Sequence, residues 1–199
     1  MNSSTKKDTD KDHARKSLLL LRSQLSAALQ QQKSAQIIDH IKKSDVLNSA
    51  KNIAYFHAVR GEANPAELAN VAPKHTQFYL PVIAPNKNEG LLFAPINQDT
   101  EFKNNQFSIP EPIVDSSEMI NARDLDLVIM PLLGFDNSGN RLGMGGGYYD
   151  RCFAFKKDKE LKPILLGFSY DFQEIGPIST EPWDIGLDMI ATESALIRF

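Results

Sequence analysis

The stretch from Leu125 to Asp150 constrains this chain more than any other segment. It opens with a short run of apolar and branched residues, typical of a buried strand, which Pro131 stops. Segment 136–140 has the composition of a turn, and a cluster of glycines between positions 143 and 147 follows it. Such glycines let the backbone adopt conformations that are closed to other residues. The stretch therefore predicts a strand, a turn, a glycine loop and the first turn of a helix.

This glycine loop has the features of a phosphate-binding site. Successive exposed N–H groups form a concavity that binds anions, and the N-terminus of a following helix adds positive potential. Arg141 supplies a positive charge on one side of the loop, and Asp150 supplies a carboxylate on the other. Phosphate oxygens bind the first, and a magnesium ion that accompanies them binds the second. A nucleotide phosphate site is the favoured interpretation, and a surface loop that precedes a helix is the alternative.

The order of residues in the loop excludes two common phosphate motifs. A P-loop needs Lys followed by Ser or Thr after its last glycine, and a dinucleotide fingerprint needs a glycine where Tyr148 stands. Instead, the segment Arg141–Asp150, RLGMGGGYYD, preceded by Pro131–Asp136, PLLGFD, resembles the signature of the 5-formyltetrahydrofolate cyclo-ligase family, also called 5,10-methenyltetrahydrofolate synthetases. The similarity extends from about Lys11 to the C-terminus, so it covers nearly the whole chain.

Composition bounds the class of protein. A chain of 199 residues, 42% of them hydrophobic, suits one domain, which we expect over 10–199 after a polar, disordered tail over 1–9. The formal charge of −3 gives no support to nucleic-acid binding. The single cysteine, Cys152, excludes an intrachain disulfide, and we expect it to be a core residue rather than a nucleophile. The polar first dozen residues carry no secretory signal, and no apolar run is long enough to span a membrane, so we expect a soluble, cytoplasmic monomer.

Hydrophobic periodicity predicts helices that alternate with strands. A first helix begins near position 10, with leucines at positions 18, 21, 25 and 29 on its inner stripe, and a second helix runs over 26–43. Short apolar runs predict strands over 53–56, 78–83, 91–93, 125–130, 164–168 and, last in the chain, 187–192. This alternation indicates an α/β domain with a mostly parallel sheet that is covered on both faces. The family resemblance implies a three-layer α/β/α sandwich, similar to the sheets of sugar-phosphate isomerases and CoA-transferases.

Two basic residues near the N-terminus, Lys11 and Arg15, stand four positions apart. Spacing alone favours a solvated basic face that also includes Arg22. The resemblance instead assigns Lys11 and Arg15 to the phosphates of ATP, together with the glycine loop. Met144 and Gly146 replace basic residues that some family members carry, so the remaining cations supply more of the positive charge here. The ATP-binding residues that the resemblance implies are Lys11, Arg15, Arg141, Leu142, Gly143, Met144, Gly145, Gly146, Gly147, Tyr148 and Tyr149.

The resemblance also implies residues for the folate and for a metal ion. Glu62 and Phe107 match folate-contacting positions, and we expect Tyr149 beside them. By residue type alone, a loop glutamate is more often solvated, and an aromatic residue in an irregular loop more often packs against its neighbours. Asp150 and Asp184 match two metal-binding aspartates and imply Mg²⁺, while a loop-capping role is the alternative for Asp184.

The implied reaction converts ATP and 5-formyltetrahydrofolate into ADP, phosphate and 5,10-methenyltetrahydrofolate. A formamide is a weak electrophile and its oxygen leaves poorly, and transfer of the γ-phosphoryl group to the formyl oxygen removes both obstacles before N10 attacks. Such a transfer needs positioning and charge neutralisation more than a strong base. We expect Arg141, Tyr148 and Asp150 to be the catalytic residues. Two other hypotheses are a folate- or nucleotide-binding module without turnover, and a sugar-phosphate isomerase of the same broad fold.

Overall fold

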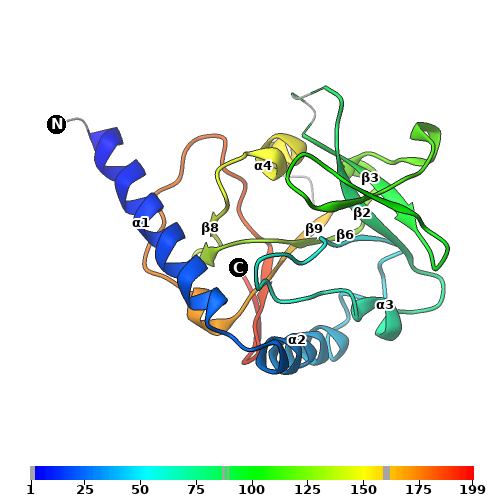
Figure 1. Ribbon diagram of the computed structural model, residues 1–199, viewed down its shortest axis with the longest axis horizontal. Helices are drawn as coiled ribbons and strands as arrows, with labels where there is room; N and C mark the ends of the chain where they lie inside the picture. Colours follow the sequence, from blue (N-terminus) through cyan, green and yellow to red (C-terminus); the bar gives the residue numbers. More distant parts are fainter. Residues whose placement is uncertain (1–2, 87, 89, 159–161) are drawn as a thin grey trace.

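The computed structural model describes residues 3–86, 88, 90–158 and 162–199. Within these residues the central sheet has seven strands, in the order β11-β10-β9-β6-β1-β2-β3 (Figure 1). The five inner strands run parallel, and the edge strands β3 and β11 are antiparallel to their neighbours. The mostly parallel sheet predicted from the sequence is confirmed. The strands of this sheet are β1 (Asn52–Ala54), β2 (Gln77–Ile83), β3 (Leu91–Ile96), β6 (Leu127–Met130), β9 (Ile164–Phe168), β10 (Met189–Ala191) and β11 (Leu196–Arg198).

The remaining elements surround this sheet. Two small two-stranded sheets stand apart from it, one formed by β4 (Phe102–Asn104) with β5 (Pro110–Pro112), the other by β7 (Gly134–Phe135) with β8 (Arg141–Leu142). The α-helices are α1 (Ser3–Ser23), α2 (Ala27–Lys42), α3 (Leu68–Val71) and α4 (Tyr148–Cys152). Short 3₁₀ helices are η1 (Ser116–Glu118), η2 (Ala122–Asp124), η3 (Ala154–Asp158) and η4 (Asp171–Gln173).

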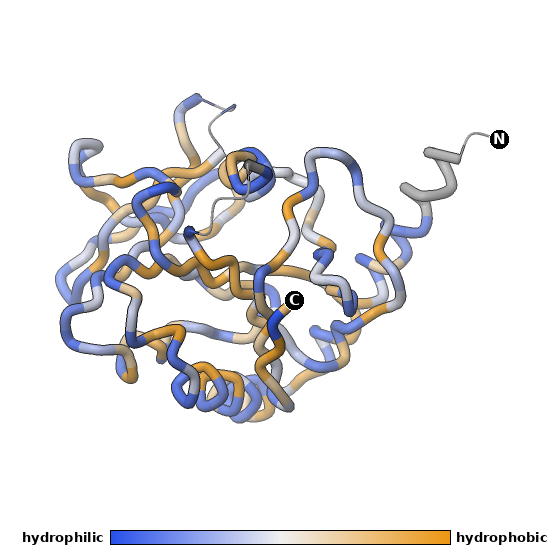
Figure 2. The backbone as a smooth tube through the Cα atoms, turned by 180° about the vertical axis from the view of Figure 1, so that it is seen from behind, coloured by the Kyte–Doolittle hydropathy of each residue, from blue (hydrophilic) through white to orange (hydrophobic). Residues whose placement is uncertain are grey.

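Core residues alternate between the two faces of the sheet. All four residues of β6 are buried, and Leu127 and Ile129 pack in the same cluster as the isoleucines of α2. Val128 and Met130 pack in a second cluster, which includes Cys152 of α4. Figure 2 shows apolar positions gathered along the inner strands, with hydrophilic segments outside them. The sheet is therefore covered on both faces, with α2 on one side and α4 on the other (Figure 1), and the predicted three-layer α/β/α arrangement is confirmed.

Helix α2 shows why the sequence forms this layer. Ser26 is its N-cap, and the Ser26 side chain accepts a hydrogen bond from the N–H of Leu29. Ile37, Ile38 and Ile41 are all buried against the sheet. Full burial of one isoleucine side chain contributes about 1.5–3 kcal/mol, so this face stabilises the packing of the helix on the core.

Helix α1 differs from the sequence prediction in two respects. It begins at Ser3 rather than near position 10, and the division into a tail over 1–9 and a domain over 10–199 stays a prediction. The predicted leucine stripe is only partly buried, because Leu21 is 44% exposed and Leu29 is 37% exposed. The inner face of α1 instead carries Leu18 and Arg22, which are both buried. The buried face is rotated about the helix axis by part of a turn relative to the predicted leucine stripe, and it includes a basic residue, Arg22.

Two further differences concern the C-terminal half. The strand predicted over 187–192 is β10, but it is not the last one, because β11 follows it and pairs with it at the edge of the sheet. The helix after the glycine loop, α4, has only five residues before the chain continues into a 3₁₀ helix. None of the helices in the described residues combines the length and apolar character needed to cross a bilayer.

Candidate active site

One cleft of about 920 Å³ lies at the carboxyl ends of the parallel strands. The segments that follow β1 and β6 form its floor, where ligand sites of open α/β sheets are usually found. The glycine loop and α1 form its walls. Every site residue expected from the sequence lines this cleft: Lys11, Arg15, Glu62, Phe107, Arg141, Leu142, Gly143, Met144, Gly145, Gly146, Gly147, Tyr148, Tyr149, Asp150 and Asp184.

The hairpin before the glycine loop is held by one buried carboxylate. Asp136 is 2% exposed, and its side chain accepts hydrogen bonds from the N–H groups of Ser138, Asn140 and Ile178 and from the Asn140 amide. Burial raises the pKa of Asp136, but these hydrogen bonds outweigh it and the pKa lies below its usual value. The predicted turn over 136–140 is thereby fixed, and it sets where Arg141 begins the loop.

The glycine loop presents free backbone donors to the cleft. Gly145 and Gly147 have φ angles of 89° and 65°, in the left-handed region that favours glycine. Two arginines hold the loop through its carbonyl groups: Arg15 Nε donates to Gly143 O at 3.0 Å, and Arg151 Nη1 donates to Gly146 O at 3.1 Å. Among the described residues, the N–H groups from 143 to 147 have no hydrogen-bond acceptor. The geometry is that of an anion-binding concavity.

A buried ion pair closes one side of the loop. Arg141, whose side chain is 7% exposed, donates from Nη2 to Asp150 Oδ1 at 2.6 Å. Asp150 Oδ1 also accepts the Ile185 N–H at 3.1 Å, so the residue before it, Asp184, lies at the same end of the cleft. The Nε of Arg141 is buried and has no partner among the described residues. A buried guanidinium with an unused donor suits an anionic ligand, because an unsatisfied buried polar group is costly.

The two aspartates suit a magnesium ion that is shared with a ligand. Asp184 Oδ2 accepts the N–H of Glu181 at 2.9 Å and lies 3.7 Å from Lys11 Nζ. Asp150 Oδ2 and Asp184 Oδ1 accept no hydrogen bond from the described residues. The described residues include no cluster of three acidic, histidine or cysteine side chains that could hold a metal alone. Mg²⁺ ordinarily takes one or two carboxylates, several waters and substrate phosphates, and this pair would fit the protein's share.

The other end of the cleft carries a buried carboxylate. The Glu62 side chain is 14% exposed, its Oε2 accepts the Val59 N–H at 3.0 Å, and its Oε1 lies 3.5 Å from Arg22 Nη1. Burial raises the pKa of Glu62, and the Val59 N–H and the Arg22 charge oppose part of that rise. Glu62 is therefore a positioned acceptor rather than the solvated loop residue that its type alone favours.

Arg22 is the site residue that sequence reasoning missed. The spacing placed it on a solvated basic face, but it is 1% exposed and lines the cleft. Its Nη2 donates to Arg60 O at 3.0 Å, next to its contact with Glu62. The available signal was its position on the same helical stripe as Lys11 and Arg15, eleven and seven residues further along.

Aromatic side chains line the cleft between these ends. Phe107 is 48% exposed and meets Tyr148 edge to face, with ring centroids 6.0 Å apart. Tyr149 stacks on Phe153, and burial raises the pKa of its hydroxyl. Cys152, the last residue of α4, is buried, and burial raises the pKa of its thiol to about 12. The prediction that Cys152 is a core residue is confirmed, and Phe107 is open to a ligand.

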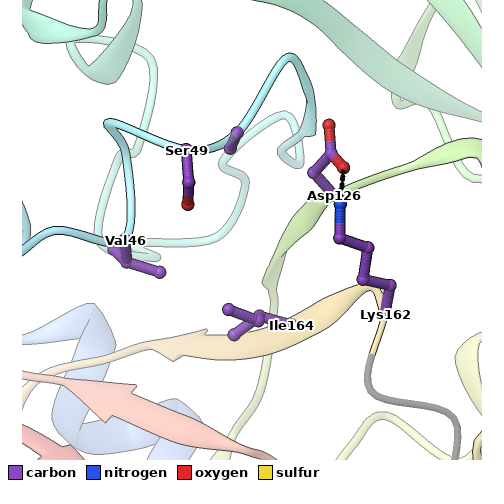
Figure 3. Close-up of a pocket in the computed structure, with 6 residues that line it drawn as sticks. Val46, Ser49, Asp126, Lys162 and Ile164 are labelled. Carbon is purple, nitrogen blue, oxygen red and sulfur yellow. Dashed lines mark hydrogen bonds and ion pairs between the residues drawn. The ribbon is translucent and has the colours of Figure 1, made fainter.

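A second, small pocket lies at the opposite ends of the strands. It has a volume of about 230 Å³ and contains none of the expected site residues. Figure 3 shows Lys162 reaching across its edge to Asp126, where Nζ and Oδ1 are 2.6 Å apart. Asp126 Oδ2 also accepts the N–H groups of Lys51 and Asn52, so this ion pair fixes the start of β1. The residues there serve the fold, and the large cleft is the candidate active site.

Comparison with known proteins places the chain in a family. Residues 7–193 match the model of the 5-formyltetrahydrofolate cyclo-ligase family. The chain belongs to this family. A curated member, the 5-formyltetrahydrofolate cyclo-ligase of Haemophilus influenzae, is 35% identical over 168 residues, which cover 84% of this chain and 89% of that protein. The enzyme of the same name from Escherichia coli strain K12 is 34% identical over 146 residues, covering 73% and 79%.

Solved structures agree with this membership. The NMR structure of Aquifex aeolicus 5,10-methenyltetrahydrofolate synthetase superimposes with a TM-score of 0.78 at 29% identity, covering 94% of this chain and 92% of that one. A Mycoplasma pneumoniae 5,10-methenyltetrahydrofolate synthetase, 22% identical, shares the fold with a TM-score of 0.69 over 92% of this chain and 99% of that one. The resemblance inferred from the glycine segment is confirmed for the family and for its fold.

Proposed function

We infer that this chain is a ligase that converts 5-formyltetrahydrofolate and ATP into 5,10-methenyltetrahydrofolate, ADP and phosphate. The observation that carries this function is the family match over residues 7–193, whose signature segment lines the large cleft. The hypothesis of a binding module without turnover is not favoured, because the charged residues expected at the site are present and meet in one place. The isomerase hypothesis has no support from the family.

We propose that the glycine loop holds the triphosphate of ATP. The unpaired N–H groups of 143–147 and the free Nε of Arg141 are donors for phosphate oxygens. Lys11 and Arg15 add positive charge from α1. Asp150 and Asp184 would hold Mg²⁺ against the phosphates, and the ion would supply neutralisation of the charge that develops during phosphoryl transfer.

The opposite end of the cleft is the proposed folate site. Glu62 is a carboxylate with oxygens directed by Val59 and Arg22, and it would accept N–H groups of the pterin ring. Phe107 would cover the flat face of the ring, with Tyr149 beside it. With the pterin held there and the triphosphate held at the loop, the γ-phosphoryl group meets the formyl oxygen between them, which is the positioning that this reaction needs.

In the proposed chemistry, the formyl oxygen attacks the γ-phosphorus and the bond to ADP breaks. The resulting iminium phosphate has an electrophilic carbon and a good leaving group. N10 then attacks this carbon, phosphate departs, and the loss of the N10 proton leaves the methenyl bridge. Arg141 would neutralise the phosphoryl oxygens, Asp150 would hold Arg141 in place, and Tyr148 would line the path of transfer.

The test of this function is a direct assay. Purified protein with ATP, Mg²⁺ and 5-formyltetrahydrofolate should produce the ultraviolet absorbance of the methenyl product, with one ADP released for each product formed. Omission of ATP, or its replacement by a non-hydrolysable analogue, is the control that should give no product. Absence of product with all three components present would contradict the function. The monomeric state and the cytoplasmic location stay predictions.

A further inference from the structure

Among the aromatic side chains that line the cleft, Trp183 is an exposed one that has no role in the proposed function. Trp183 lines the cleft and is 63% exposed, the highest exposure among the large hydrophobic residues described. It lies in a turn closed by two hydrogen bonds, from the N–H of Glu181 to Asp184 Oδ2 and from the N–H of Asp184 to Glu181 O. A large apolar ring held in an ordered turn and left open to a cleft is a surface suited to a flat ligand group.

Helix α1 fixes where this ring lies relative to the two substrates. Lys11 pairs with Asp184, beside Trp183, and Arg15 donates to the Gly143 carbonyl one helical turn later. Arg22 contacts Glu62 two turns beyond that. At 1.5 Å per residue, the two ends of this series are roughly 16 Å apart. Trp183 and Glu62 therefore stand at opposite ends of the cleft, with the glycine loop between them.

This order determines which flat group reaches Trp183. With the pterin at Glu62, the γ-phosphate has to lie between the glycine loop and Glu62, because it is transferred to the formyl group. The rest of ATP then extends the other way, toward Lys11 and Asp184. The base at its far end then meets Trp183. We propose that Trp183 stacks on the adenine base of ATP; this inference rests on the proposed function.

The chain offers a direct probe for this contact, because Trp183 is its single tryptophan. Titration of the wild-type protein with ATP and Mg²⁺ should quench or shift the tryptophan fluorescence to saturation. Inorganic tripolyphosphate with Mg²⁺ carries the same phosphates without a base, so it should compete with ATP yet leave the emission unchanged. An equal fluorescence change with tripolyphosphate, or none with ATP, would overturn the stacking.

Kinetics of three variants complete the test. Trp183→Ala should raise the KM for ATP about tenfold, within the range that one base–aromatic stack supplies, with the KM for 5-formyltetrahydrofolate unchanged. Trp183→Phe should restore most of the affinity, because it keeps an aromatic face. Phe102→Ala removes another exposed aromatic residue, 47% exposed and outside the residues that line the cleft, and should change neither KM.

The outcomes separate the two proposals. If the wild-type protein forms product and Trp183→Ala keeps its KM for ATP, only the stacking fails. If Trp183→Ala raises the KM for the folate instead, the benzoyl ring of that substrate is the occupant and the adenine assignment is wrong. If the wild-type protein forms no product, the proposed function fails, and the fluorescence titration still decides whether a base binds at Trp183.

Discussion

At the scale of single residues, Asp150 joins three parts of the cleft. Its Oδ1 holds Arg141 and the Ile185 N–H, while Oδ2 stays available. The same carboxylate thus sets the position of Arg141, the proposed phosphate-binding cation, and of the segment that carries Asp184. An amide oxygen could make the same hydrogen bonds, so an asparagine at this position tests the contribution of the charge.

We predict that Asp150→Asn loses turnover without losing the fold. The asparagine keeps an oxygen for Arg141 and Ile185 but removes the charge, so kcat should fall on the order of 10²-fold, as for the loss of one electrostatic contact to a transition state. Steady-state assays at increasing Mg²⁺ measure this, with thermal unfolding as the check on folding. Asp45→Asn, an exposed change outside the cleft, is the matched control. Wild-type kcat at saturating Mg²⁺ would remove Asp150 from the site.

A second residue, Arg22, affects the cleft through its contact with Glu62. The groups that face Glu62 are Arg22 from α1, Arg60 from its own loop, Tyr149 from α4 and Tyr170 after β9. Burial lowers the pKa of Arg22, but the guanidinium remains the cation in direct contact with the carboxylate. When the Arg22 guanidinium is removed, the charged form of Glu62 keeps the cost of its burial but loses the cation that offsets part of it.

We predict that Arg22→Met weakens folate binding in a pH-dependent way. The pKa of Glu62, already raised by burial, should rise further, so the KM for the folate should increase more at pH 6 than at pH 8. Because the pKa of Glu62 is raised on folding, its neutral form favours the folded state, and this contribution to stability is lost as the pH rises through that pKa. The free energy of unfolding should therefore fall by about 3 kcal/mol at pH 8 and by less at low pH.

Urea unfolding and folate kinetics across this pH range check the Arg22 prediction. Lys16→Met, an exposed charge on the same helix, is the control and should match the wild type. The double variant Arg22→Met, Glu62→Gln should regain stability but not folate affinity, because it removes both charges together. An increase in the folate KM that is equal at every pH would show that Arg22 is structural only.

At the scale of elements, the glycine loop depends on backbone conformations that a side chain disfavours. Gly147 has a φ of 65°, and a Cβ there would lie 2.8 Å from Arg151 Nη1. Gly147→Ala should therefore cost about 1–2 kcal/mol of stability and raise the KM for ATP as the loop shifts. Gly176→Ala is the control, because nothing lies within 4 Å of its Cβ and its φ is ordinary. Equal stability and equal KM in the two variants would contradict the role of this conformation.

The elements also show which predictions sequence supports. The strands β2, β6 and β9 were predicted within a few residues. A continuous apolar run is stable as a strand that is covered on both faces by other layers of the fold, so its sequence signal is clear. Strand β11, with two of its three residues exposed, has no such signal. The buried face of α1 was misplaced because charged side chains occupy part of it, and periodicity analysis counts only apolar ones.

Part of the candidate site could be predicted from the sequence. The segment 141–150 is continuous, so its residues and its chemistry could be read together. Lys11, Glu62, Phe107 and Asp184 come from distant segments, and no spacing rule places them near the loop; the family resemblance supplied them. Arg22 was missed because its spacing alone favoured a solvated face, and Trp183 was assigned no role. In the folded cleft Arg22 is buried beside Glu62 and Trp183 is exposed.

At the scale of the whole molecule, a bound nucleotide should stabilise the fold through its contacts with α1, the glycine loop and the 181–184 turn. Ligand at about 100 times its Kd adds about 2.7 kcal/mol, which for a domain of this size raises Tm by roughly 5–10 °C. We predict that ATP with Mg²⁺ produces such a shift and that a chelator removes most of it. Differential scanning calorimetry measures it, with Mg²⁺ alone as the control. An undiminished shift in the chelator would mean that the nucleotide binds without the metal.

The contacts of α1 have a consequence for the catalytic cycle. Besides Leu18 with its small cluster and Arg22 with Glu62, this helix is held by Lys11 on Asp184 and by Arg15 on the Gly143 carbonyl. At the proposed ATP site, a triphosphate would compete for Lys11 and Arg15, and its metal ion would compete for Asp184, so an entering nucleotide would displace the protein's internal partners. When ADP and phosphate leave, Lys11 and Asp184 would pair again, and the recovered ion pair would favour an emptied cleft over retained product.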